Sequence, residues 1–260
     1  MFVCLRHDSW GKDVAVVEGC TSLENTDSAR GNGGRIFRIG HRGAAGHAAE
    51  NTIAAIRKGI SLGVDFVEVD VQRTRDGRLV VMHDERVDRT TDGTGLISAM
   101  TWDEVRRLDA GDGEGVPGVE AVLAEASGRV GVMLEVKAAG IGADLYRAVA
   151  MAEFSGPVIY ASFLHAEIVA IRRIDPLART MALVECVPAS GAGLARDAKA
   201  QMVGLNHEFA SADSMATLHE AGVEVWVYTV NEPEMIRRAV DVGADGVISD
   251  YPERVAKVRG

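Results

Sequence analysis

A regular alternation of short apolar runs with segments of helical period restricts the fold of this sequence more than any other feature. From Ile36 onward, runs rich in Val and Ile alternate with stretches in which apolar residues recur at helical spacing. This alternation is typical of repeated βα units, in which helices connect the strands of a parallel sheet. The sequence therefore predicts an α/β protein.

Eight of the apolar runs can be assigned as strands, with helical stretches between them. Eight such strands predict a (β/α)8 TIM barrel, and 260 residues is a common length for one barrel domain. Gly63, Gly222 and Gly243 follow helical stretches, and we expect them to end those helices. The expected strands are residues 36–40, 66–71, 130–136, 158–162, 180–184, 202–205, 223–229 and 246–249.

A ninth apolar run, residues 79–82, does not fit this alternation because too few residues separate it from the second strand. A parallel crossover needs about a dozen residues or more, so we predict a β-hairpin after the second strand. The dipeptide Asp76-Gly77 is a strong signal for a two-residue turn. Counting outward from such a turn places His83 opposite Asp70.

Residues 1–34 differ in composition from the rest of the chain. They carry scattered polar residues without a sustained period and end in a stretch rich in glycine, a composition typical of flexible segments. We expect an N-terminal extension that is poorly ordered or loosely docked, or a stretch read from an upstream start. One barrel is expected over residues 35–260.

Charge and composition exclude several classes of partner. The chain has 28 Lys and Arg against 38 Asp and Glu, and its formal charge is −10. Nucleic acid and anionic membrane surfaces need clustered cations, so we expect neither as a partner. No apolar run approaches the roughly 20 residues that span a bilayer, and residues 14–17 are too few for a secretory core segment. Cys4, Cys20 and Cys186 lack CxxC spacing, which fits free thiols in the cytoplasm, where we expect the protein.

Polar residues gather near the ends of the expected strands and of the hairpin. In barrels of this kind the active site lies at the C-terminal ends of the strands. Three carboxylates, two histidines and two cations are therefore expected to converge there, namely Glu68, Asp70, Glu135, His41, His83, Arg42 and Lys137.

The three carboxylates favour a metal site. Glu68 and Asp70 are two residues apart on a strand, so both side chains point to the same face. Carboxylates that face one another inside a barrel are costly, and a divalent cation bound also by Glu135 removes that cost. Oxygen ligands suit Mg²⁺, Ca²⁺ or Mn²⁺ better than Zn²⁺. The alternative is a structural network in which Arg42 and Lys137 pair with these acids.

An ordered set of short motifs resembles the glycerophosphodiester phosphodiesterases over residues 37–255. That resemblance implies a (β/α)8 barrel that hydrolyses glycerophosphodiesters to sn-glycerol 3-phosphate and an alcohol with a divalent metal. The motifs are His41-Arg42-Gly43, Glu50-Asn51-Thr52, Glu68-Val-Asp70, His83-Asp84, Glu135-Val-Lys137, Ser162-Phe163, Tyr228-Thr-Val-Asn231 and Ser249-Asp250-Tyr-Pro252.

The resemblance also implies a role for each of the converging residues. A metal together with Arg and Lys neutralises the charge that develops on phosphoryl oxygens, and two histidines can act as base and acid near neutrality. Which histidine is the acid stays open, as does the nucleophile, which is water or a neighbouring glycerol hydroxyl that forms a cyclic phosphate. The implied metal ligands are Glu68, Asp70 and Glu135, the acid/base pair is His41 and His83, and the phosphate ligands are Arg42 and Lys137.

Other residues keep two interpretations. Asn51 or Thr52 is either a helix cap or a substrate contact, and Asp250 either orients a ligand or caps the last loop. Tyr228 stands where the family often has Trp, and the segment after Gly111 is shorter than the family's usual insertion, so the alcohol portion of the substrate stays open. His47, His165, His207 and His219 are taken as surface or cap residues.

Three rival functions remain. The nearest is a related phosphodiesterase that acts on lysophospholipids or sphingomyelin-like substrates with the same metal and histidines. A barrel that binds a phosphate ligand without catalysis would not need both His41 and His83. A metal-dependent aldolase or isomerase on the same fold would need a base beside a carbonyl group instead.

Overall fold

The computed structural model describes residues 4–7, 13–16, 35–186 and 190–258. The chain divides into two units, Met1–Arg30 and Gly31–Gly260. In the first unit, β1 (Cys4–His7) pairs antiparallel with β2 (Asp13–Val16). The rest of the expected extension lies outside the described residues.

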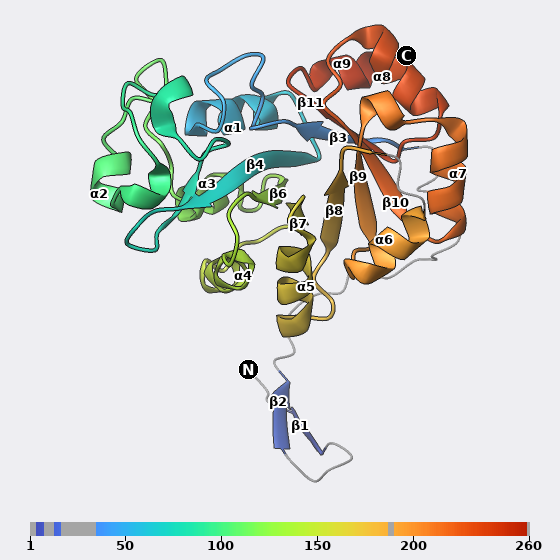
Figure 1. Ribbon diagram of the computed structural model, residues 1–260, viewed down its shortest axis with the longest axis horizontal. Coiled ribbons are helices and arrows are strands. Elements are labelled where there is room, and N and C mark those ends of the chain that lie inside the picture. Colours follow the sequence, from blue (N-terminus) through green and yellow to red (C-terminus); the bar gives the residue numbers. More distant parts are fainter. Residues whose placement is uncertain (1–3, 8–12, 17–34, 187–189, 259–260) are drawn as a thin grey trace. The chain divides into compact units, whose positions relative to one another are not determined.

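The second unit is built on a nine-stranded sheet that closes into a barrel (Figure 1). Its wall is formed by parallel strands in the order β3-β11-β10-β9-β8-β7-β6-β4, and the pairing of β3 with β4 closes it. The α/β fold class and the (β/α)8 TIM barrel are therefore confirmed, and each expected strand bound lies within two residues of the observed one. The wall strands are β3 (Phe37–Gly40), β4 (Phe66–Arg73), β6 (Gly131–Val136), β7 (Val158–Ser162), β8 (Thr180–Val184), β9 (Met202–Asn206), β10 (Glu224–Tyr228) and β11 (Gly246–Ser249).

Helices lie around the outside of this barrel (Figure 1). Gly63, Gly222 and Gly243 have positive φ values of +73°, +73° and +98°, which confirms them as helix ends. None of the helices in the described ranges has the length and apolar character that crossing a bilayer requires. The helices are α1 (Ile53–Ser61), α2 (Trp102–Val105), α3 (Val119–Ala126), α4 (Gly142–Met151), α5 (His165–Ile174), α6 (Gly191–Asp197), α7 (Ala212–Glu220), α8 (Pro233–Asp241) and α9 (Glu253–Lys257), with 3₁₀ turns η1 (Val87–Arg89), η2 (Ile97–Ala99) and η3 (His207–Phe209).

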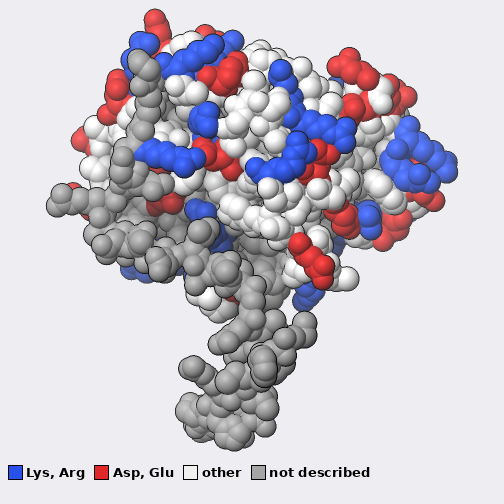
Figure 2. Space-filling view, turned by 180° about the vertical axis from the view of Figure 1, so that it is seen from behind, with Lys and Arg blue, Asp and Glu red and all other residues white. Residues whose placement is uncertain are grey.

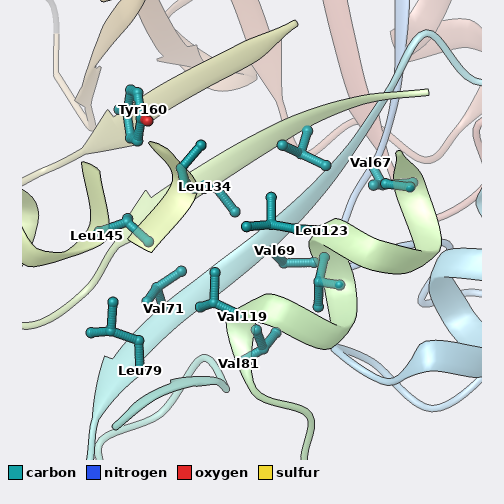
Figure 3. Packing of buried hydrophobic residues seen from close by; sticks show 14 of the residues in the cluster. Val67, Val69, Val71, Leu79, Val81, Val119, Leu123, Leu134, Leu145 and Tyr160 are labelled. Carbon is teal, nitrogen blue, oxygen red and sulfur yellow. The ribbon is translucent and has the colours of Figure 1, made fainter. Parts of the chain in front are cut away.

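Strand β4 shows how the sequence separates the two faces of the wall. Val67, Val69 and Val71 are fully buried on the outer face, where Figure 3 shows them beside Val119 and Leu123 of α3. Burying each such valine stabilises the fold by roughly 1.5–3 kcal/mol. The alternate residues of β4 point into the barrel, as a strand requires. The interior is filled by Ile39, Phe66, Met133, Ile159, Met181, Leu183, Trp226 and their neighbours.

The hairpin after the second strand is confirmed, but its predicted register is wrong by one residue. Strand β5 (Leu79–Val81) pairs antiparallel with β4 with Val71 opposite Val81, and Met82 N–H donates to the carbonyl of Asp70 at 2.9 Å. The loop has three residues rather than two, because Gly77 adopts a left-handed φ of +87° that this longer loop accommodates. His83 therefore does not lie opposite Asp70.

The segment between β5 and α3 forms a small core of its own beside the barrel. We call this segment the insertion. Its core also includes a residue of β5, and the core residues are Val80, Met82, Val87, Ile97, Val105, Ala110 and Val116.

Positive and negative side chains are mixed on the face shown in Figure 2. Lys and Arg lie there among Asp and Glu, and neither sign forms a large patch of its own on the part of this face that the structure describes.

Candidate active site

Three carboxylates converge inside the barrel, as the sequence predicts. Glu68 and Asp70 are inward residues of β4, and Glu135 of β6 is the register neighbour of Asp70. One carboxylate oxygen from each residue lies within 4.8 Å of the others. Glu68 is 2% exposed and Asp70 1%, so the cluster is nearly removed from solvent.

The carboxylate oxygens of this cluster are not all satisfied by hydrogen bonds from the described residues. Glu68 Oε1 and Asp70 Oδ1 are buried and accept no hydrogen bond from the described residues. Burial, with Asp70 and Glu135 nearby, raises the pKa of Glu68 well above its usual range, and burial together with Asp70 raises the pKa of Glu135 to about 7. A divalent cation would satisfy the free oxygens and remove the repulsion. The donor set consists of oxygens only, so it fits Mg²⁺, Ca²⁺ or Mn²⁺.

Two cations face the same cluster. Arg42 Nε lies 3.3 Å from Asp70 Oδ2, and Lys137 Nζ lies 2.8 Å from Glu135 Oε1 and 3.7 Å from Asp70 Oδ1. Burial opposes their charged forms, but the surrounding carboxylates outweigh it and raise the pKa of both Arg42 and Lys137. The ion pairs expected of a structural network are thus present, yet two buried carboxylate oxygens still receive no hydrogen bond from the part of the chain that the structure describes.

The loop after β3 shapes one side of the cluster. Arg42 adopts a positive φ of +49°, and its backbone N–H donates to Glu68 Oε2 at 2.8 Å. Asn51, with a φ of +60°, donates its side-chain amide to Asp70 Oδ2 at 2.8 Å. Thr52 caps α1 by accepting from Ala55 N–H at 3.2 Å. The helix-cap interpretation therefore applies to Thr52, whereas Asn51 binds a carboxylate of the cluster.

His41 lies at the end of β3 and is held by a carboxylate. Its Nδ1 lies 2.7 Å from Asp250 Oδ1, and Asp250 Oδ2 accepts from the Asn231 amide at 2.6 Å. Burial opposes ionisation of Asp250, but the hydrogen bonds from His41 and Asn231 prevail and hold its pKa below the usual range. Asp250 therefore orients the His41 ring through Nδ1, and Nε2 is the ring nitrogen that does not take part in this contact.

His83 has a similar arrangement on the insertion. Its Nδ1 lies 2.6 Å from Asp84 Oδ1, and Arg89 donates to Asp84 Oδ2 at 2.6 Å. The hydrogen bonds from Arg89 and from His83 hold the pKa of Asp84 far below its usual range. A small cavity beside His83 is lined by Glu50, Asn51 and residues of the insertion. Sequence reasoning missed Arg89, whose only signal was its position soon after the His83-Asp84 motif.

Two aromatic residues lie at the candidate site, one of them beside Lys137. Tyr228 donates its hydroxyl to the carbonyl of Val184 at 2.7 Å, and its ring meets Phe163 edge to face with centroids 5.9 Å apart. The Phe163 ring lies 5.8 Å from Lys137 Nζ. Phe163 is 38% exposed, so it offers apolar surface next to a cation of the cluster.

Two of the histidines set aside in the sequence have carboxylate partners outside this cluster. His47 Nε2 lies 3.1 Å from Glu253, and His219 Nε2, in the last turn of α7, lies 2.9 Å from Asp245.

Comparisons with known proteins agree with one another. Residues 41–254 match the glycerophosphoryl diester phosphodiesterase family. The glycerophosphodiester phosphodiesterase of Caldanaerobacter subterraneus subsp. tengcongensis is 33% identical over 232 residues, which cover 83% of this chain and 94% of that protein. A glycerophosphodiester phosphodiesterase of Bacillus subtilis is 29% identical over 255 residues, 86% of this chain and 87% of that protein.

Solved structures give the same answer. The glycerophosphodiester phosphodiesterase of Agrobacterium tumefaciens superposes with a TM-score of 0.76 at 28% identity, over 86% of this chain and 100% of the other. A phosphodiesterase of Oleispira antarctica, solved with its product sn-glycerol 3-phosphate, has a TM-score of 0.80 at 26% identity, over 85% and 95% of the two chains.

Proposed function

Because the chain belongs to the glycerophosphoryl diester phosphodiesterase family, we propose that it hydrolyses glycerophosphodiesters to sn-glycerol 3-phosphate and an alcohol, with a divalent cation. The observation that carries the proposal is the buried cluster of Glu68, Asp70 and Glu135, which holds two carboxylate oxygens without a hydrogen-bond partner among the described residues. Such a cluster is costly for the protein alone and suits a bound cation. This activity belongs to lipid and glycerol metabolism.

Glu68, Asp70 and Glu135 would hold the cation, and their oxygens suit Mg²⁺ or Ca²⁺, with Mn²⁺ as a third candidate. When bound, the cation supplies positive charge that offsets the negative charge of the phosphodiester.

Arg42 and Lys137 bind the non-bridging phosphate oxygens in this proposal. Both already lie beside the carboxylates, Arg42 at 3.3 Å from Asp70 and Lys137 at 2.8 Å from Glu135. Their raised pKa values keep both side chains charged at neutral pH. Charge that develops on the phosphoryl oxygens during attack is therefore met by cations that are already in position.

His41 and His83 transfer the protons. Each has its Nδ1 bound to a carboxylate, which leaves Nε2 to accept or donate a proton. One histidine takes the proton from the attacking oxygen, and the other gives a proton to the departing alcohol oxygen. Asp250 and Asp84 keep the two rings in orientation while this happens.

The test measures release of glycerol 3-phosphate from glycerophosphocholine by the purified protein with Mg²⁺, Ca²⁺ or Mn²⁺, and with EDTA. Release should require a metal and fall by about 10²–10⁴-fold in His83→Ala. His219→Ala serves as the control, because that histidine is paired with Asp245 outside the cluster. No release with any metal would reject this substrate class.

A lysophospholipid is the second candidate substrate. Phe163 and Leu164 are 38% and 40% exposed, and the Phe163 ring lies 5.8 Å from Lys137 Nζ. This apolar surface beside a phosphate-binding cation can accept an acyl chain. Release from lysophosphatidylcholine faster than from glycerophosphocholine would favour it.

A cytoplasmic location is part of the same proposal. It is supported by the spaced cysteines and by a small soluble diester as substrate.

A further inference from the structure

A line of alternating charges joins the phosphate-binding Arg42 to His83. Arg42 Nη1 donates to Glu50 Oε1 at 2.7 Å. Arg89 donates to the two oxygens of Glu50 at 2.9 Å and 2.7 Å, and to the two oxygens of Asp84 at 2.6 Å and 3.2 Å. Asp84 Oδ1 in turn lies 2.6 Å from His83 Nδ1. Arg89 therefore lies at the centre of the line and contacts both carboxylates.

These residues come from separate segments of the chain. Arg42 and Glu50 belong to the loop that follows β3, whereas Arg89 ends the 3₁₀ turn η1 in the insertion. His83 and Asp84 follow strand β5. Arg89 thus ties the insertion, which carries His83, to the barrel loop that carries Arg42.

The chemistry of the contact favours arginine in particular. The guanidinium donates four hydrogen bonds from two of its edges, with Nε and Nη2 toward Asp84 and Nη1 and Nη2 toward Glu50. Lysine carries a compact point charge and cannot reproduce that geometry. Arg89 is 48% exposed. Single ion pairs at the surface contribute little to folding stability, whereas bidentate pairs within a network contribute more. Kinetic measurements are therefore needed to separate a positioning role from a stabilising one.

The other histidine is held differently. Asp250, which binds His41, accepts from the neutral amide of Asn231 at 2.6 Å, and both belong to loops of the barrel itself. The carboxylate that holds His83, Asp84, instead accepts from a cation, Arg89, which lies in the insertion. Among the described residues, the two histidines therefore differ in the charge of the group behind their carboxylate.

We infer that Arg89 is a positioning residue for the hydrolysis, which orients His83 through Asp84 and Arg42 through Glu50, so that proton transfer and phosphate binding depend on one side chain. The inference rests on the proposed function.

The experiment compares Arg89→Gln and Arg89→Lys with Arg86→Gln. Arg86 is a matched control, since it lies three residues earlier, is 56% exposed and, among the described residues, has its ion pair with the nearby Asp88 at 3.0 Å. Steady-state kinetics on glycerophosphocholine with the preferred metal give kcat and KM for each variant. Arg89→Gln should lower kcat/KM by about 10²-fold, and Arg89→Lys should recover part of this loss by restoring the charge without the fork. Arg86→Gln should stay within about 3-fold of wild type.

The split between kcat and KM separates positioning from simple stabilisation. Asp84→Asn should lower kcat, Glu50→Gln should raise KM, and Arg89→Gln should do both. Adding Arg89→Gln to Asp84→Asn should lower kcat by less than about 3-fold further, because both changes act through His83. Thermal unfolding of every variant is followed alongside.

The outcomes are distinct. If wild type releases no product, the proposed function fails and the inference fails with it. Two results would overturn only the positioning role while wild type is active. The first is kinetics of Arg89→Gln equal to those of Arg86→Gln. The second is a double variant in which the decrease in kcat of Arg89→Gln multiplies fully with the decrease in kcat of Asp84→Asn. If Arg89→Gln does not fold, Arg89→Lys decides: kcat and KM equal to those of wild type would overturn the role.

Discussion

The barrel interior has two layers of side chains, an upper layer near the C-terminal ends of the strands and a lower layer beneath it. Both layers come from the same strands, but they contribute differently to stability and to the candidate site. On β4, Phe66 fills the lower layer, whereas Glu68 and Asp70 lie above it. The lower layer is close-packed, with the rings of Phe37 and Phe66 at 5.5 Å and 5.4 Å from Trp226. In the upper layer two buried oxygens have no hydrogen bond from the described residues. One layer therefore stabilises the fold, and the other reduces stability in exchange for a binding site.

The largest effect is expected from Glu68→Gln in the upper layer. Loss of a ligand charge should reduce metal-dependent turnover by at least about 10³-fold, equivalent to about 4 kcal/mol of transition-state stabilisation. Thermal unfolding in EDTA should not shift downward, because the change removes a buried carboxyl whose ionised form is disfavoured by burial and by Asp70 and Glu135. Glu234→Gln, on the exposed side of α8, is the control. Turnover equal to that of wild type would remove Glu68 from the ligand set.

The opposite result is expected from Trp226→Ala in the lower layer. Trp226 is fully buried, and its removal should lower the free energy of unfolding by about 3–5 kcal/mol. Activity per folded molecule should change much less than in Glu68→Gln. Urea titration followed by circular dichroism gives the stability. A large loss of turnover in a variant of unchanged stability would contradict the division into layers.

A smaller, pH-dependent effect should follow from Glu135→Gln in the absence of metal. The native carboxyl keeps its proton up to a pKa of about 7, whereas an unfolded glutamate loses it near 4.5. Between these values the native state binds more protons than the unfolded state, so wild-type stability falls as pH rises. The amide variant lacks this loss.

Its stability relative to wild type should therefore rise by about 1–3 kcal/mol between pH 5 and pH 8. Unfolding in EDTA at several pH values measures the difference. Saturating metal should cancel or reverse the advantage of the variant, since bound cation favours the ionised wild type. A difference that is constant with pH would argue against the raised pKa.

The smallest effect is expected at the boundary between the layers, from Tyr228→Phe. The change removes the hydroxyl that donates to the Val184 carbonyl at 2.7 Å, which should cost about 0.5–1.5 kcal/mol of stability. Glycerophosphocholine turnover should stay within about 3-fold of wild type, because the ring and its contact with Phe163 remain. A much larger loss of kcat would assign the hydroxyl to the substrate instead.

Regular strands made much of this architecture predictable. The side-chain period of two on β4 places Glu68 and Asp70 on one face, and strand adjacency adds Glu135. The hairpin register was less accessible, because Asp76-Gly77 is compatible with loops of two or three residues, and here Gly77 supports the longer one.

The individual hydrogen bonds made by loop residues could not be predicted. Arg42 and Asn51 adopt left-handed φ values of +49° and +60° that non-glycine residues rarely show. Glu50 and Arg89 are 39 residues apart in sequence, and no period relates two loop positions. Only the folded chain reveals that they meet.

The small core of the insertion makes this segment a natural target for exchange by protein engineering. Val80 of β5 packs with Met82, Val87 and Ile97 of this segment. A replacement segment from a relative can therefore bring most of its own core, but it must also reproduce contacts with the barrel such as the hydrogen bond from Ala54 N–H to Glu114. Such a chimera would still have to supply its own histidine and an arginine in reach of Glu50. Grafts chosen for length alone should stay inactive, whereas grafts that keep the contact with Glu50 should combine a new substrate preference with the same carboxylate cluster.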